Sequence, residues 1–113
     1  MKKTASTFVR ILASLAWVGA AHASQGSYQG TVTSVFATGG IVLVTVSNGA
    51  GQLICSGVAQ FWVDPSTDFG RTQMALAMAA KASGALVYVQ GNGACSTAWP
   101  YNNTEQLVAL NWE

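Results

Sequence analysis

Short apolar segments rich in valine, isoleucine and threonine dominate the chain after residue 27, and glycine-containing breaks separate them. This pattern is typical of β-strands. Gly39-Gly40 predicts a hairpin turn, and Asn48-Gly49-Ala50-Gly51 predicts a second turn. We therefore expect five strands, over residues 28–38, 41–47, 52–56, 86–90 and 105–112, of which the third can continue through 58–63.

One segment breaks the strand pattern and predicts a helix. It runs from about Asp68 to Ser83 and follows Asp64-Pro65-Ser66-Thr67, which offers helix caps. Gly84 suits the left-handed conformation that ends many helices. Three strands, a helix and two strands are the order of a five-stranded OB-fold-like barrel, in which the helix plugs one end. The alternative is an open α+β sheet.

The predicted helix is apolar around most of its circumference. At about 100° per residue, Phe69, Leu76 and Ala80 fall on one face, which we expect to seal the barrel. Met74 and Met78 lie nearly opposite. Helices that are apolar on several sides are usually buried on more than one. We expect the methionine face to meet either identical subunits, in a homo-oligomer, or loops of the same chain.

The first 23 residues have the pattern of a secretory signal peptide. Lys2, Lys3 and Arg10 precede an apolar run of about ten residues, and Ala21-His22-Ala23 provides a cleavage site before Ser24. The mature chain, 24–113, is then a single domain without a membrane span, secreted or periplasmic. In that oxidising environment we expect Cys55 and Cys95 to form a disulfide, the alternative being two free buried thiols.

Charge and composition argue against several functions. Loss of His22 leaves no histidine, so a Ser-His-Asp triad and imidazole metal ligation are excluded, and no metal or cofactor is expected. Nucleic acid binding needs a basic groove, and the mature chain carries a net charge of −2. Its basic residues are Arg71 and Lys81, and its acidic residues are Asp64, Asp68, Glu105 and Glu113. We expect no enzyme; a hydrolase using Asp64 or Asp68 is the less favoured alternative.

Aromatic and amide side chains are the remaining candidates for binding. Trp99, Tyr101, Asn102 and Asn103 cluster in one predicted loop, and Trp62 precedes the helix. Flat rings beside amides suit sugars, whose C–H faces stack while their hydroxyls bond the amides, and they also suit protein interfaces. The alternative is that Trp62 and Trp99 close the ends of a small core and that Asn102-Asn103 forms a turn.

Several of these segments are similar to a known group of proteins. The stretches Tyr28-Gln29-Gly30-Thr31-Val32 and Phe36-x-Thr38-Gly39, Cys55-Ser56 on the third strand, and Ser83-Gly84 followed by Val87-Tyr88-Val89 resemble the B subunits of bacterial toxins, the subtilase cytotoxin type in particular. The pattern from FWVDPST to the second cysteine resembles small uncharacterised exported bacterial proteins more closely still.

The resemblance implies an OB-fold, a pentameric assembly and binding of sialylated glycans. In that family a serine just before the first-strand glycine contacts the sugar, and here Gln29 stands in its place. The function we expect is an exported, non-enzymatic subunit that binds a glycan or a protein. The alternative is an accessory or inhibitor protein of an exported enzyme.

Overall fold

The computed structural model describes residues 25–55 and 57–112, so the predicted signal peptide and cleavage site lie outside the described residues. Within that part the chain is mainly β with one helix, as predicted. The elements are β1 Ser27–Thr38, β2 Ile41–Gln52, β3 Gln60–Val63, α2 Asp68–Ser83, β4 Leu86–Gly91 and β5 Glu105–Trp112.

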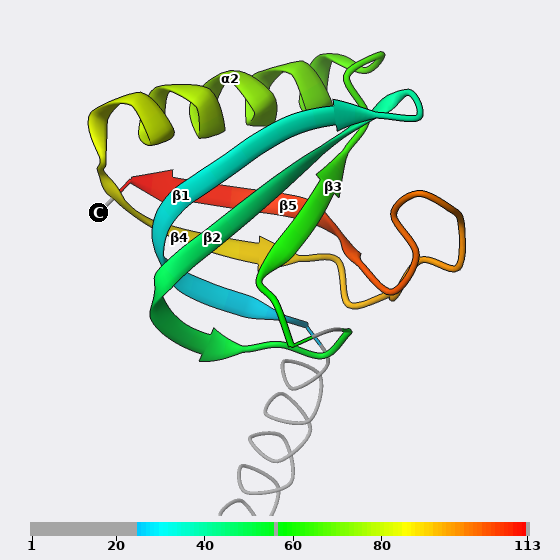
Figure 1. Cartoon of the computed structure of the whole chain (residues 1–113), viewed down its shortest axis with the longest axis horizontal. Coiled ribbons are helices and arrows are strands. Elements are labelled where there is room, and N and C mark those ends of the chain that lie inside the picture. The colour runs from blue at the N-terminus through cyan, green and yellow to red at the C-terminus, as the bar shows by residue number, and fades with distance from the viewer. Residues whose placement is uncertain (1–24, 56, 113) are drawn as a thin grey trace, which may run out of the picture.

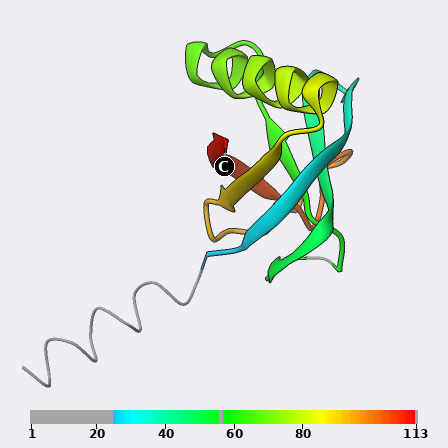
Figure 2. The ribbon, with the colours of Figure 1, turned by 90° about the vertical axis from the view of Figure 1, so that its left-hand side faces the viewer.

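The strands form a closed barrel in the order β1-β2-β3-β5-β4, with β1 pairing both β2 and β4. The β3–β5 pair is parallel and short, joining Phe61 to Glu105 and Trp62 to Gln106, whereas the other pairs are antiparallel. Figures 1 and 2 show α2 lying across one end of the barrel. The helix therefore stands between β3 and β4 in the chain and closes one mouth in space.

The second turn predicted at residues 48–51 is wrong, because β2 runs through it. Asn48 has a φ of 62°, and the β1–β2 register shifts between Gln29 and Thr31. A side chain at Gly49 would overlap the Gln29 carbonyl. The Asn-Gly pair thus forms a bulge inside a long, bent strand rather than a hairpin turn, and the bend of β2 is visible in Figure 1.

The third strand is also displaced from its predicted place. The described residues 52–55 of the predicted strand do not form it; β3 occupies 60–63, within the segment predicted as its continuation. Phe61 and Val63 are each 1% exposed and point into the core, while Trp62 lies on the outer side. Cys55 is therefore in the β2–β3 connection and not on a strand, which corrects the prediction.

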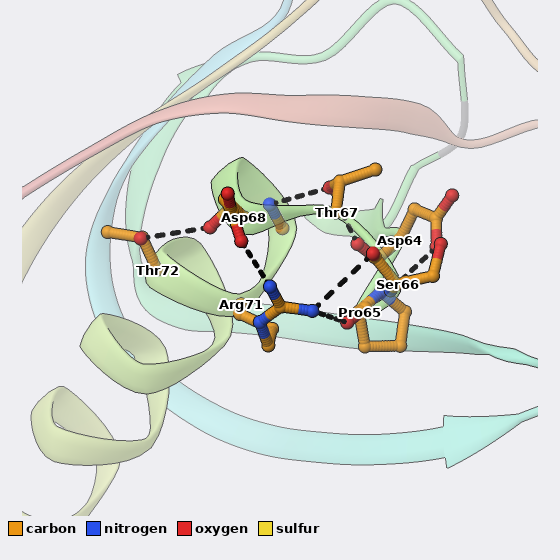
Figure 3. Close-up of polar contacts among 8 residues, drawn as sticks. Asp64, Pro65, Ser66, Thr67, Asp68, Arg71 and Thr72 are labelled. Carbon is orange, nitrogen blue, oxygen red and sulfur yellow. Dashed lines mark hydrogen bonds and ion pairs between the residues drawn. The ribbon is translucent and has the colours of Figure 1, made fainter.

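The helix begins and ends where the sequence predicts. Thr67 is the N-cap, and its hydroxyl oxygen accepts a hydrogen bond from the Gly70 amide at 2.9 Å (Figure 3). Gly84 has a φ of 70° and donates its amide to the Ala80 carbonyl. Among the described residues, α2 is too short and too weakly apolar to cross a bilayer.

The helix face predicted to seal the barrel is confirmed at Ala80 but is wrong at Phe69 and Leu76. Phe69 and Leu76 are 50% and 37% exposed, while the buried helix residues are Gly70, Gln73, Ala77 and Ala80. A Cβ at Gly70 would overlap the Asp64 carbonyl, so the backbones approach closely there. Small residues let the helix lie against the barrel end, and the bulky residues are left on its flanks. Met78 is 54% exposed, but Met74 packs against the core.

The barrel encloses one hydrophobic core. Val44, Phe61 and Leu107 are at its centre, each at most 1% exposed. The β4–β5 register shifts between Gln90 and Gly91, so the buried leucines of β5 are Leu107 and Leu110, while Val108 is only partly buried.

The predicted disulfide is confirmed. Cys55 and Cys95 are bonded, with their Cα atoms 5.4 Å apart and a sequence separation of 40. The bond joins the β2–β3 connection to the β4–β5 connection. It therefore ties the two connections that flank the short β3–β5 pairing.

Removal of the disulfide will lower the free energy of unfolding by about 4 kcal/mol, because the unfolded chain regains the conformational entropy that closing a loop of this length removes. The comparison is between the wild type and a Cys55→Ala/Cys95→Ala variant in urea denaturation. A Ser96→Ala variant, beside the same bond, serves as the control. A double variant as stable as the wild type would contradict the prediction.

Candidate functional site

The β4–β5 connection, residues 92–104, is anchored at several points. Cys95 is bonded to Cys55, and the Ser96 and Thr104 backbones are joined by a 2.9 Å hydrogen bond that closes the loop upon itself. Further along, the Pro100 ring lies so close to Gly39 that a Cβ there would overlap it. The connection therefore reaches from the disulfide to the β1–β2 turn.

Trp62 and Tyr101 meet on the outer side of the barrel. Their ring centroids are 4.7 Å apart at 43° between planes, a tilted aromatic pair. The Cα partner of Trp62 on β2 is Leu43, which is 4% exposed although it lies outside the main core cluster. The loop thus packs on the outer face of β2 and β3. Trp62 Nε1 is buried there without a hydrogen-bond partner among the described residues.

Trp99 stands out from this packed base. Its side chain is 80% exposed, the highest value among the exposed large hydrophobic residues of the described chain. Asn102 and Asn103 follow within four residues and are also exposed. We call Trp62, Trp99, Tyr101, Asn102 and Asn103 the aromatic-amide surface. It has a rigid aromatic base, one projecting ring and two neighbouring amides.

Gln29 does not belong to this surface. It is exposed on β1, where it pairs with Ala50 and Tyr88. Trp62 lies across from Leu43, whose partner on β1 is Phe36, seven residues further along that strand. At about 3.3 Å per residue, roughly 20 Å of strand separates the two places. A single small ligand will not contact both.

Asp64 and Asp68, the carboxyl groups of the hydrolase alternative, both have partners at the helix start (Figure 3). The Ser66 hydroxyl and amide donate to Asp64 Oδ1 at 2.6 and 2.9 Å, and these bonds hold the pKa of Asp64 below its ordinary value. Asp68 pairs with Arg71. Each group thus has a structural role at the N-terminus of α2.

A buried carboxyl group escaped the sequence analysis, which placed Glu105 only at the start of a strand. Glu105 is 2% exposed, and its Oε1 accepts from the amides of Gly26 at 3.1 Å and Gly93 at 2.8 Å. Side chains at Gly26 or Gly91 would overlap the carboxyl group. No local sequence pattern predicts this cluster, because Gly26 and Glu105 are 79 residues apart in sequence.

The hollow beside Glu105 is too small for an organic ligand. Only about 10 Å³ is open to the centre of a water molecule, which is room for one water. Its lining comes from Leu53, Ile54, Cys55, Val58, Gln60, Phe61 and Glu105. Typical ligand pockets measure roughly 300–1,000 Å³. The aromatic-amide surface is therefore the better candidate site.

Comparison with known proteins adds no identification. The chain matches no protein-family model, no curated protein and no solved structure. No group of three or more potential metal ligands occurs among residues 25–55 and 57–112. The candidate site accordingly depends on the geometry described above.

Glu105→Gln will lower the free energy of unfolding by about 1–3 kcal/mol, because an amide oxygen is a weaker acceptor than a carboxylate for two buried N–H groups. Chemical denaturation measures the change. Asp68→Asn is the matched control and should have a smaller effect, since Asp68 is 97% exposed and solvent screens its ion pair with Arg71. Equal effects of the two substitutions would show that the buried hydrogen bonds do not stabilise the fold.

Proposed function

We propose that this chain is an exported, non-enzymatic binding domain with an OB-like barrel, which recognises a glycan through the aromatic-amide surface. The observation that carries the proposal is the 80% exposed ring of Trp99 on a loop held by a disulfide. Exposure of a large apolar ring to water costs free energy in proportion to its exposed area. A ligand that stacks on the ring would account for it.

The topology supports the OB-like part of the proposal. The strand order β1-β2-β3-β5-β4, the parallel β3–β5 pair and a helix between β3 and β4 match the arrangement of that barrel. In OB-folds the face of strands 2 and 3 and the β1–β2 and β4–β5 loops bind ligands. Trp62 on β3 and Trp99 in the β4–β5 loop occupy those places. A shared fold alone does not identify the ligand, because one fold can serve many functions.

Anchoring of the β4–β5 loop supports a role in ligand binding rather than in catalysis. The Cys55–Cys95 bond and the Trp62–Tyr101 contact hold the base of the loop before any ligand arrives. Preorganisation of this kind lowers the entropy cost of binding. Asn102 and Asn103, three and four residues after Trp99, are exposed and supply neutral donors and acceptors of the kind that hydroxyl recognition requires.

An accessory or inhibitor role is the second candidate, and the flanks of α2 favour it. Phe69 and Leu76 are 50% and 37% exposed on one flank of the helix, and Met78 is 54% exposed on the opposite flank. Exposed apolar residues on one element are typical of protein interfaces. The flank with Met78 also suits the assembly of identical subunits in a toxin B-subunit-like ring.

Trp99→Ala will weaken glycan binding about tenfold or more, since loss of an aromatic anchor costs roughly 1.4 kcal/mol or more. A glycan array identifies a ligand, and calorimetry then compares the variants. Trp112→Ala is the matched control, because Trp112 is 48% exposed at the far end of β5. No glycan signal on the array, or equal loss in both variants, would count against the proposal.

If the helix flank joins identical subunits, Met78→Glu will reduce the mass measured by light scattering after size-exclusion chromatography to that of the monomer. The charge would be buried without a partner in the interface. Gln52→Glu, on the exposed part of β2, is the control and should leave the mass unchanged. A wild-type chain that is monomeric at high concentration would rule out the homo-oligomer.

A further inference from the structure

We infer that the aromatic-amide surface selects uncharged sugars over sugars that carry a carboxylate, such as sialic acid. The inference rests on the proposed glycan-binding function and names the class of ligand within it. It departs from what the toxin B-subunit resemblance implies. The argument depends on where the few charges of this chain lie.

Among residues 25–55 and 57–112, no basic side chain is free to serve this surface. The described chain contains two basic residues, Arg71 and Lys81. Arg71 already pairs with Asp68 and donates to the carbonyls of Pro65 and Ser66 at 3.4 Å each (Figure 3). Its charge is therefore compensated at the start of the helix. Specific recognition of a carboxylate usually employs such a guanidinium or another charge-assisted donor.

Lys81 is too far away to take that role. It lies in the last turn of α2. Figure 1 shows the C-terminal end of α2 on the left of the molecule and the β4–β5 loop on the right, and Figure 2, viewed from that left side, has the end of the helix in front. The two are thus at opposite sides of the barrel. Salt screens such a distance, because the Debye length at physiological ionic strength is about 8 Å.

The charged residue nearest to Trp62 in sequence is negative. Asp64 follows Trp62 by two residues, and its hydrogen bonds from Ser66 favour the ionised form. Asp68 and Arg71 neutralise one another, so this end of the helix and β3 has a net charge of −1. An approaching carboxylate meets repulsion rather than attraction.

The groups that remain fit a neutral pyranose. The exposed Trp99 ring offers a flat face with negative partial charge, which attracts the slightly positive C–H groups of a sugar. The amides of Asn102 and Asn103 can both donate to and accept from hydroxyls. A carboxylate placed there would lose hydration without gaining an ionic partner. The surface is therefore complementary to uncharged sugars.

The test compares matched glycans that differ only in the acidic cap, N-acetyllactosamine against its α2,3- and α2,6-sialylated forms, together with other neutral and capped pairs on an array. We expect the uncapped member of a bound pair to have a Kd roughly fivefold lower, the size of effect expected for like charges that interact through solvent. The difference should shrink at high salt.

Variants separate this inference from the proposed function. Asp64→Asn retains an acceptor for Ser66 but removes the charge, so the ratio of the Kd values for the sialylated and uncapped glycans should decrease. Lys81→Gln should leave that ratio unchanged. Equal or tighter binding of the sialylated member would overturn the inference and leave glycan binding intact. Binding of no member of any pair would overturn the proposed function, and the inference with it.

Discussion

The short parallel pairing of β3 with β5, which we call the seam, is the constraint on which the rest of this structure depends. Two residue pairs join these strands, whereas β1 and β2 pair at ten positions. The Cys55–Cys95 bond links the connections beside the seam, and Glu105, the first residue of β5, binds the amides of Gly26 and Gly93. A covalent bond and buried hydrogen bonds thus reinforce the barrel where its backbone ladder is shortest. Without them, the loop that carries Trp99 would no longer be held in a fixed position relative to β3, the strand that carries Trp62.

The same reinforcement determines what the molecule can present to a ligand. The interior is filled by side chains, and the hollow at Glu105 has room for one water. In the proposed function, recognition therefore falls to the outer surface, where rigidity has to come from the loop itself. The disulfide supplies that rigidity at one end, and the packing of Tyr101 against Trp62 supplies it in the middle. The proposed site is consequently a projecting ring on a fixed base rather than a cleft, which is a geometry suited to binding and poorly suited to enclosing a reaction.

In α2, residue size decides which apolar side chains are buried against the barrel and which are exposed. Gly70, Ala77 and Ala80 allow close approach to the barrel end, so the larger Phe69 and Met78 are displaced to the flanks. Exposed apolar residues on α2 therefore follow from the way the barrel is closed. Charges are scarce, and those at the start of α2 are largely engaged with one another. The electrostatic character of the proposed binding surface is set by this arrangement and by Asp64, and not by any charged residue of the loop.

The sequence by itself determined the mainly β composition with one helix, the limits of that helix and the pairing of the two cysteines. Capping at Thr67 and the left-handed Gly84 act within one turn of chain, and two cysteines have a single possible intramolecular pairing. Only the tertiary structure decided that β2 continues past Asn48, that Gly70 and Gln73 rather than Phe69 face the core, and that Trp62 meets Tyr101. It also buried Glu105 against Gly26, which lies 79 residues away. These outcomes depend on which distant backbones can approach one another, and hydrophobic periodicity along a single segment contains no information about that approach.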